Sequence, residues 1–258
     1  MQYYVVDAFT DKLFQGNPAG VCLLEKWLSS ETMQCIAAEN NLSETAFIVK
    51  RDTYYDLRWF TPQVEVDLCG HATLAAAFVV NNFVDGAGEI MRFETKSGLL
   101  TVAKKDDLLE MDFPARKPDR IEITPQITQA VSLSILEAHS SRDLLLLAEN
   151  EQQIKSFTPD FELLKQIGGY LGIIITATGD KVDFVSRFFA PAAGVPEDPV
   201  TGSAHSSLIP FWAERLGKDK MIARQLSPRG GALYCENCGD RVKIAGKAIL
   251  YLRGEIMI

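Results

Sequence analysis

The sequence is poor in histidine and cysteine, and it has no long apolar segment. It contains three histidines and five cysteines among 258 residues. An odd number of cysteines without framework spacing is typical of reduced thiols, which argues against a disulfide scaffold. No run reaches the ~20 apolar residues that a membrane-spanning helix needs. We therefore expect neither a disulfide-rich secreted protein nor a helical membrane protein.

Positive charge and nucleotide-binding motifs are also scarce. The 26 Lys and Arg residues are outnumbered by 34 Asp and Glu residues, which gives a net charge of −8. Such a surface repels nucleic acids and anionic membranes, so neither is an expected partner. The sequence has no dinucleotide fingerprint, Walker loop or Gly-x-Ser-x-Gly elbow. The first residues, 1–7, indicate a strand and lack the features of an export signal, so we expect a soluble cytoplasmic protein.

One pair of cysteines has the spacing of a metal or redox site. Cys235 and Cys238 lie between two glycine-containing segments, in a pattern typical of a β-hairpin. A zinc site needs a second ligand pair, and a redox Cys-x-x-Cys opens a helix. A structural turn is the favoured interpretation, and metal or redox chemistry is the alternative.

The most informative feature present is an internal repeat. Residues 58–72 contain Arg58-Trp-Phe-Thr-Pro62 and Asp67-Leu-Cys-Gly-His-Ala72, and residues 187–205 contain Arg187-Phe-Phe-Ala-Pro191 and Asp198-Pro-Val-Thr-Gly-Ser-Ala-His205. Each copy indicates an aromatic strand, a turn, an acidic loop and a glycine that opens an apolar segment. The repeat predicts two similar domains, over 1–115 and 119–258, joined at 114–118. The last strand could return to the first domain.

The pattern of strands and helices predicts an α+β fold. Many strands, few helices and no regular βαβ alternation argue against a doubly wound parallel sheet. Segments 71–83 and 203–216 are almost wholly apolar, which is typical of a helix buried on every side. We therefore expect two curled sheets, each enclosing one helix. Pro210 predicts a kink in the second helix or a different boundary.

The two glycine junctions are candidate binding sites. Small residues at Gly70 and at Gly202-Ser203 leave backbone N–H groups accessible at a helix N-terminus, where the dipole favours an anion. Two such helix ends, facing each other across an interdomain cleft, could bind a carboxylate or stabilise an enolate. The structural alternative is that each glycine only serves a tight turn.

Glu44, His71 and Cys69 are candidate chemical groups. A partly buried Glu44 could transfer protons near neutral pH, although an exposed strand-entry carboxylate is the alternative. The helix dipole is expected to lower the pKa of His71, which could equally be a structural residue. A thiol at a helix N-terminus has a lowered pKa, so Cys69 could act as a base. The equivalent position in the second half is Pro199, which excludes a symmetric two-thiol mechanism.

Two further residues of the second half have simpler interpretations. Asp198 precedes the second junction and indicates a cap or a loop turn. His205 lies one step inside the second apolar helix, and a role in the core, or in support of the site, is favoured.

Taken together, these motifs resemble the phenazine-biosynthesis PhzF-like family, within the diaminopimelate epimerase-like fold. The resemblance implies two pseudo-symmetric domains, each an antiparallel barrel-like sheet around a central helix, assembled as a homodimer. The matching segments are 16–20, 41–46, 58–62, 67–73, 93–98, 197–205 and 212–217.

The same resemblance implies a cofactor-independent isomerase without a metal. Glu44 would move a proton within a small carboxylate-bearing metabolite, and His71 and Asp198 would assist proton transfer and orient the substrate. Gly70 and Ser203 would bind the carboxylate or amino group of the substrate, and Gly202 and Cys69 complete the expected binding set. The role of Cys69 in the chemistry stays open. The alternative is a non-catalytic protein of the same fold that binds a small molecule or another protein.

Overall fold

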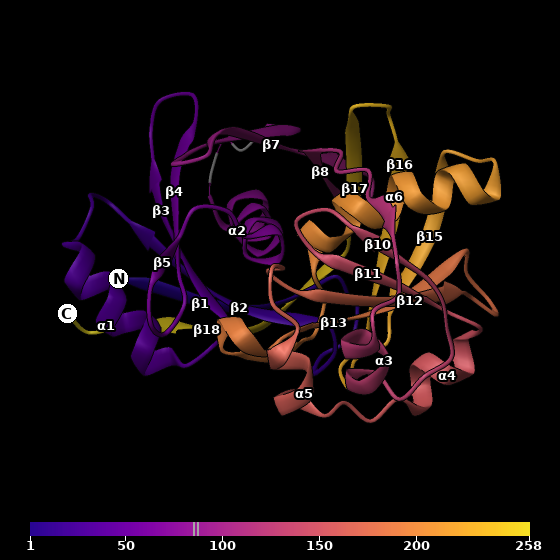
Figure 1. Cartoon of the computed structure of the whole chain (residues 1–258). Helices are drawn as coiled ribbons and strands as arrows, with labels where there is room; N and C mark the ends of the chain where they lie inside the picture. The colour runs from indigo at the N-terminus through magenta and orange to yellow at the C-terminus, as the bar shows by residue number, and fades with distance from the viewer. Residues whose placement is uncertain (85, 87) are drawn as a thin grey trace. The chain divides into compact units, whose positions relative to one another are not determined.

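The computed structural model describes residues 1–84, 86 and 88–258, which form two compact units (Figure 1). Unit 1 comprises Met1–Asp112 together with Ala245–Ile258, and unit 2 comprises Phe113–Ile244. The C-terminal segment belongs to unit 1 because β18 (Ala248–Glu255) pairs antiparallel with β1 (Gln2–Ala8). The chain thus begins and ends in one unit.

Unit 1 is a mixed sheet with one central helix. β1 pairs antiparallel with β2, β2 parallel with β3, β3 antiparallel with β4, and β4 antiparallel with β5 and parallel with β6. β7 then follows antiparallel to β6, and β8 antiparallel to β7. These strands are β2 (Asn17–Leu24), β3 (Glu44–Lys50), β4 (Tyr55–Phe60), β5 (Glu65–Val66), β6 (Ile90–Thr95), β7 (Gly98–Lys105) and β8 (Leu108–Pro114).

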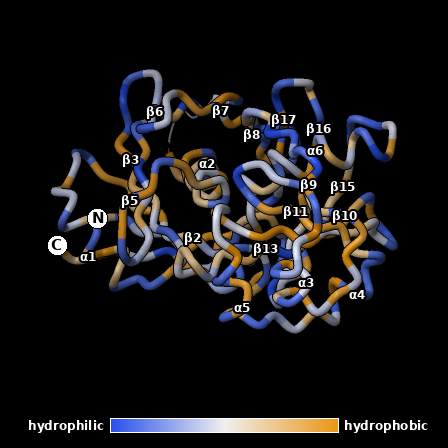
Figure 2. The backbone as a smooth tube through the Cα atoms, viewed as in Figure 1, coloured by the Kyte–Doolittle hydropathy of each residue, from blue (hydrophilic) through white to orange (hydrophobic). Residues whose placement is uncertain are grey.

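The central helix of unit 1 is α2 (Gly70–Phe83). Between Gly70 and Val80 every residue except Phe78 is buried, and the helix packs against β1, β2 and β3. A helix without a polar face is stable only when every side is covered, which explains its place inside the sheet. Figure 2 colours α2 mainly as hydrophobic. The buried helix predicted from 71–83 is confirmed.

A second helix of unit 1, α1 (Ser30–Asn40), contributes to another apolar cluster. Its N-cap is Ser29, whose hydroxyl accepts a hydrogen bond from the Thr32 N–H at 3.1 Å. The helix ends at Asn41, which has the left-handed backbone conformation common at helix ends. Met33 and Ile36 on α1 join Phe47 and Phe60 of the sheet in this cluster.

Unit 2 repeats the pairing pattern of unit 1. β10 pairs antiparallel with β11, β11 parallel with β12, β12 antiparallel with β13, and β13 antiparallel with β14 and parallel with β15. β9 pairs with β10 as β18 does with β1, and β16 pairs with β15 as β7 does with β6. The strands are β9 (Asp119–Ile121), β10 (Ile135–Ser140), β11 (Leu144–Ala148), β12 (Ile173–Thr178), β13 (Phe184–Ala190), β14 (Val195–Asp198), β15 (Lys220–Gln225), β16 (Gly231–Asn237) and β17 (Arg241–Gly246).

The central helix of unit 2 is α6 (Gly202–Leu216), which lies between β14 and β15 in the chain as α2 lies between β5 and β6. It continues through Pro210 and ends at Gly217, whose φ of +65° is the left-handed conformation that glycine adopts without strain. Trp212 anchors it, because the ring stacks on Phe184 and Nε1 donates to Thr176 Oγ1 at 2.9 Å. The unit also contains three short α-helices, α3 (Pro125–Ala130), α4 (Glu151–Ser156) and α5 (Phe161–Gln166), and one turn of 3-10 helix, η1 (Pro191–Ala193).

The α+β class predicted from the sequence is confirmed. Most pairings are antiparallel, but the described strands also include two parallel pairs in each unit, which the sequence did not indicate. The shared order of parallel and antiparallel pairs is the structural counterpart of the repeat in the sequence. Within the described residues, no helix combines the length and apolarity needed to cross a membrane.

The Cys235–Cys238 segment forms a tight turn, as the sequence favoured. Cys235 is buried at the end of β16, and the N–H of Cys238 donates to the carbonyl of Arg241 at 2.9 Å, which starts β17. Gly239 has a φ of +81° and supplies the left-handed turn position. The two cysteines are not joined by a disulfide, and the segment has the hydrogen bonding of a structural hairpin.

Candidate active site

Three of the predicted residues meet at the N-terminus of α2. Glu44 is the first residue of β3, and His71 is the second residue of α2, which packs against β3. His71 Nε2 lies 3.1 Å from Glu44 Oε2, with 5% of the His71 side chain and 17% of the Glu44 side chain exposed. Glu44 is therefore partly buried against an imidazole, and not the exposed carboxylate of the alternative interpretation.

Cys69 lies on the other side of the imidazole ring. Its Sγ is 3.6 Å from His71 Nδ1, so the ring lies between a thiol and a carboxylate. Glu44 Oε2 and His71 Nε2 are both buried, and neither makes a well-aligned hydrogen bond to another described residue.

The protonation states follow from burial and from these neighbours. Burial lowers the pKa of His71, but the acidic groups of Cys69 and Glu44 outweigh burial and raise it well above its ordinary value. The raised pKa favours the protonated form of the imidazole beside Glu44. The lowered pKa expected from the helix dipole is wrong, because a full charge at 3.1 Å acts more strongly than a partial charge at the helix end.

Cys69 also differs from its prediction. Burial raises the pKa of the Cys69 thiol, and the charge of Glu44 raises it further, against the smaller opposing effects of His71 and a backbone N–H. The thiol therefore stays protonated at neutral pH. The lowered pKa expected for a thiol at the helix N-terminus is wrong, because the dipole does not offset complete burial.

Glu44, Cys69 and His71 are also the one group of described residues close enough to hold a metal ion, with potential ligand atoms within 4.8 Å of one another. The thiol, however, contacts Nδ1 while the carboxylate contacts Nε2. An imidazole binds a metal ion through one of its two nitrogens, so a thiol at Nδ1 and a carboxylate at Nε2 cannot both share one ion with that nitrogen. The arrangement of Cys69, His71 and Glu44 therefore fits proton transfer better than metal coordination.

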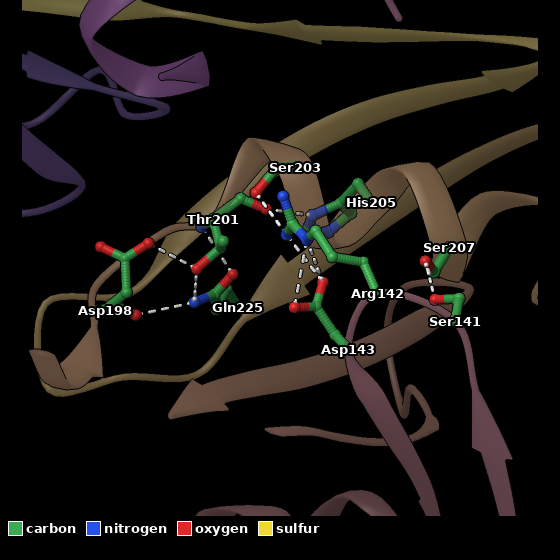
Figure 3. A network of polar contacts seen from close by, with 9 residues as sticks. All are labelled: Ser141, Arg142, Asp143, Asp198, Thr201, Ser203, His205, Ser207 and Gln225. Carbon is green, nitrogen blue, oxygen red and sulfur yellow. Dashed lines mark hydrogen bonds and ion pairs between the residues drawn. The ribbon is translucent and has the colours of Figure 1, made fainter. Parts of the chain in front are cut away.

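The predicted residues of unit 2 gather at the N-terminus of α6 (Figure 3). Asp198 ends β14, and its carboxylate accepts a hydrogen bond from Thr201 Oγ1 at 2.6 Å. Gln225 of β15 donates from Nε2 to the Asp198 carbonyl at 2.8 Å, and its Oε1 accepts from the Thr201 N–H at 2.9 Å. Asp198 is thus fixed from both its side chain and its backbone.

Ser203 follows in the first turn of α6. Its Oγ accepts a hydrogen bond from Arg142 Nη2 at 3.0 Å, and Arg142 is in turn held by Asp143 (Figure 3). Thr201, the N-cap of α6, makes no capping hydrogen bond with its side chain.

An arginine–glutamate pair precedes each junction. Arg58 Nε donates to Glu65 Oε1 at 2.7 Å, and Arg187 Nε donates to Glu197 Oε1 at the same distance. Each guanidinium also donates from Nη2 to the second carboxylate oxygen, at 2.8 and 2.9 Å. These bidentate pairs tie β4 to β5, the strand before α2, and β13 to β14, the strand before α6.

Comparison with known proteins agrees with this geometry. A family model described as phenazine biosynthesis-like protein matches residues 6–254. The chain belongs to this PhzF family. Relatives include an uncharacterized isomerase of Pseudomonas aeruginosa, 51% identical over 98% of this chain and 97% of its own length, and a bovine phenazine biosynthesis-like domain-containing protein, 41% identical over 98% of each.

Solved structures support the same assignment. A PhzF-family protein of Enterococcus faecalis superposes with a TM-score of 0.98 at 50% identity, over 100% of this chain and 99% of that one. A probable proline racemase of Agrobacterium radiobacter has a TM-score of 0.63 at 11% identity, covering 100% and 93%, and so shares the fold alone. The diaminopimelate epimerase-like fold predicted from the motifs is confirmed.

In this PhzF-family chain, the sequence-predicted residues fall into two groups. Glu44, Cys69, Gly70 and His71 lie together in unit 1, and Asp198, Gly202 and Ser203 lie together in unit 2. Sequence reasoning missed Arg142 and Gln225, which hold Ser203 and Asp198 in place. No sequence signal identified either one, because Arg142 lies in a polar turn and Gln225 ends an alternating strand.

His205 has the core role that the sequence favoured. It is fully buried, and its Nδ1 donates to the carbonyl of Thr201 at 2.8 Å. Burial lowers the pKa of His205 to about 4, so the ring is neutral at physiological pH. A neutral ring that donates to the N-cap carbonyl supports the start of α6.

Proposed function

We propose that this PhzF-family chain is a cofactor-independent isomerase that moves a proton within a small carboxylate-bearing metabolite. The observation that carries the proposal is the buried contact of 3.1 Å between Glu44 and His71 at the start of α2. The names of several relatives, which describe them as uncharacterized isomerases, support the class of reaction.

Glu44 acts as both base and acid in the proposed reaction. Its carboxylate removes a proton from one carbon of the substrate, so that a C–H bond breaks and an O–H bond forms on Glu44. The electron pair stays in the substrate and shifts its double bonds or enters an enolate. Glu44 then returns the proton to a different carbon, and the sum of the two steps is an isomerisation without oxidation.

His71 supports this cycle electrostatically. An imidazolium next to Glu44 stabilises the carboxylate before proton transfer, and its Nε2–H can donate to Glu44 or to an oxygen of the substrate. Because the pair is buried, these interactions are stronger than they would be in water. The roles predicted for Asp198, Gly70, Gly202 and Ser203 in orienting and binding the substrate remain part of the proposal.

The proposal is tested by proton exchange with solvent. The protein is incubated in D₂O with small carboxylic acids that carry an acidified C–H bond, and deuterium in the recovered acid is measured by mass spectrometry. We expect incorporation with the wild type and a reduction of about 100-fold or more with Glu44→Gln. Glu39→Gln, which alters an exposed carboxylate on α1, is the matched control and should exchange like the wild type.

Two outcomes would contradict the proposal. If Glu44→Gln exchanges as fast as the wild type, Glu44 is not the acid/base. If the wild type binds an acid tightly but catalyses neither exchange nor product formation, the chain is a non-catalytic binding member of the family.

A further inference from the structure

Gln225, the last residue of β15, contacts the segment that leads into α6 (Figure 3). The residue lies in the core and is 1% exposed. Its Oε1 accepts a hydrogen bond from the Thr201 N–H at 2.9 Å, and its Nε2 donates to the Asp198 carbonyl at 2.8 Å and to Thr201 Oγ1 at 3.1 Å. One carboxamide thus makes three hydrogen bonds to two residues of this segment.

The direction of each of these hydrogen bonds is fixed by the groups that make it. A backbone N–H only donates and a backbone carbonyl only accepts, so the Gln225 oxygen must face Thr201 N–H and its nitrogen must face the Asp198 carbonyl. An amide nitrogen is a donor, so Thr201 Oγ1 accepts the third bond. A hydroxyl has a single proton, and that of Thr201 therefore donates to Asp198 Oδ2, 2.6 Å away.

The Thr201 hydroxyl orients the Asp198 carboxylate. A hydrogen bond to an ionised carboxylate is roughly twice as strong as one between neutral groups. Thr201 is buried, so water competes little for this bond. Figure 3 shows the second carboxylate oxygen of Asp198 pointing away from Thr201. The Gln225 amide therefore sets the direction of the hydroxyl, and the hydroxyl sets the orientation of the carboxylate.

Other side chains hold the backbone on both sides of Asp198. Glu197, the preceding residue, accepts two hydrogen bonds from Arg187, and Ser227 Oγ donates to the carbonyl of Pro199, the following residue, at 2.8 Å. The bond from Thr201 Oγ1, in contrast, reaches the carboxylate of Asp198 and not its backbone. Its effect is on the orientation of that side chain.

The corresponding loop of unit 1 holds its backbone in a similar way but does not orient a carboxylate. Ser97, in the turn between β6 and β7, donates from Oγ to the Asp67 carbonyl at 2.8 Å, as Gln225 does to the Asp198 carbonyl. Asp67 is exposed, and its side chain makes no hydrogen bond to a described residue. The repeated fold therefore requires support of the backbone, whereas orientation of the carboxylate is particular to Asp198.

We infer that Gln225 is a positioning residue for Asp198: its amide directs the Thr201 hydroxyl proton to the carboxylate, and this bond holds Asp198 in one orientation toward the substrate. The inference rests on the proposed function for the role of Asp198 in the reaction. The orientation of the carboxylate itself can be measured without turnover.

The orientation is tested by NMR on the full chain labelled with ¹³C and ¹⁵N. Three-bond couplings from the Asp198 carboxyl carbon to its backbone nitrogen and carbonyl carbon report the χ1 angle. We expect the couplings of one rotamer in the wild type and couplings averaged over rotamers in Thr201→Val, which keeps the N–H that bonds to Gln225. Thr201→Ser keeps the hydroxyl and should retain one rotamer.

Two variants test Gln225 itself, and one serves as a control. Gln225→Met has a similar size without the amide, and Gln225→Asn has an amide too short for all three bonds, so both should give averaged couplings. Ser227→Ala removes a hydrogen bond from the same loop without touching the carboxylate, and it should lower stability but retain one Asp198 rotamer. Thermal unfolding of each variant shows that it is folded.

The consequence for the reaction is measured by the deuterium exchange described above. Loss of one hydrogen bond to a charged group predicts exchange about tenfold slower in Thr201→Val, whereas Thr201→Ser should exchange like the wild type. In an Asp198→Ala background Thr201→Val should have no further effect, because no carboxylate remains to be oriented. A merely structural role of Thr201 would slow exchange in both backgrounds.

The possible results separate this inference from the proposed function. The inference is overturned if Asp198 keeps one rotamer in Thr201→Val or in the folded variants of Gln225, if Ser227→Ala averages the couplings as well, or if Thr201→Val exchanges as fast as an active wild type. Absence of exchange in the wild type, together with a single Asp198 rotamer that depends on Thr201 and Gln225, would contradict the proposed isomerase and leave the role of Gln225 supported.

Discussion

Replacing His205 with glutamine should make the stability of the protein less sensitive to acid. His205 has no exposed surface, its ring lies near Phe184, and its Nε2 has no hydrogen-bond partner among the described residues. Protonation would place an unpaired charge in the core of unit 2. Burial accordingly lowers the pKa of His205 to about 4, from an ordinary value near 6.5.

The sign and size of the effect follow from proton linkage. Between about pH 6.5 and pH 4 the unfolded chain binds a proton at His205 that the folded chain does not, so the free energy of unfolding decreases as the pH falls through this window. One pKa unit corresponds to about 1.4 kcal/mol. The full contribution lost below pH 4 is therefore about 3 kcal/mol. Glutamine does not titrate, so His205→Gln should lose this part of the pH dependence.

The assay is urea unfolding at a series of pH values from 7.5 to 4.5, followed by tryptophan fluorescence. The difference in unfolding free energy between wild type and His205→Gln cancels the contributions of the other titrating groups and should change by up to about 1.4 kcal/mol per pH unit. Ser207→Ala, another buried change on α6, is the control and should shift stability without altering the slope. A flat difference curve for His205→Gln would refute the buried neutral histidine.

Three further predictions concern the candidate site and its supports. NMR titration should show that the pKa of the His71 imidazole lies above its ordinary value, and Glu44→Gln should lower that pKa. A raised pKa stabilises the fold below the unfolded pKa, so this contribution to the free energy of unfolding should be lost as the pH rises through the folded pKa. A His71 titration that is unchanged in Glu44→Gln would contradict the pairing. Arg58→Gln should destabilise the protein by about 2 kcal/mol in urea unfolding, because the hydrogen bonds of Arg58 lower the pKa of Glu65 to about 2. The difference in unfolding free energy between wild type and variant should disappear as the pH falls from about 4.5 toward 2. A difference that does not change with pH would contradict this pairing. In the native protein a maleimide reagent should label the exposed thiols, Cys35 and Cys238, and should not label the buried ones. Mass spectrometry counts the labels. Rapid labelling of Cys69 would contradict its burial.

The central helices were predictable because their signal is local. An all-apolar stretch such as 71–83 or 203–216 has to be covered on every side, and this requirement depends on composition and not on any particular neighbour. The repeat likewise indicated two related halves, since a shared series of residues produces a shared series of elements. The sequence missed α4 and the short strands β5, β9 and β14, which depend on contacts from elsewhere in the chain.

The candidate site was predictable only as a set of residues. The motifs identified Glu44, His71 and Asp198, but the direction of the pKa shifts at His71 and Cys69 depended on distances through space and on complete burial. A local dipole argument gave the wrong direction for both, because it counted neither the carboxylate at 3.1 Å nor the loss of solvent.

By itself, the sequence determined the family, the α+β class, the two buried helices and the glycine junctions, because each of these depends on residues that are adjacent in the chain. Only the tertiary structure decided which groups touch. It placed Glu44 against His71, and it brought Arg142 to Ser203, although 61 residues separate them in the chain. Electrostatic and hydrogen-bond energies depend on separation and burial in space, and a linear pattern does not contain these quantities.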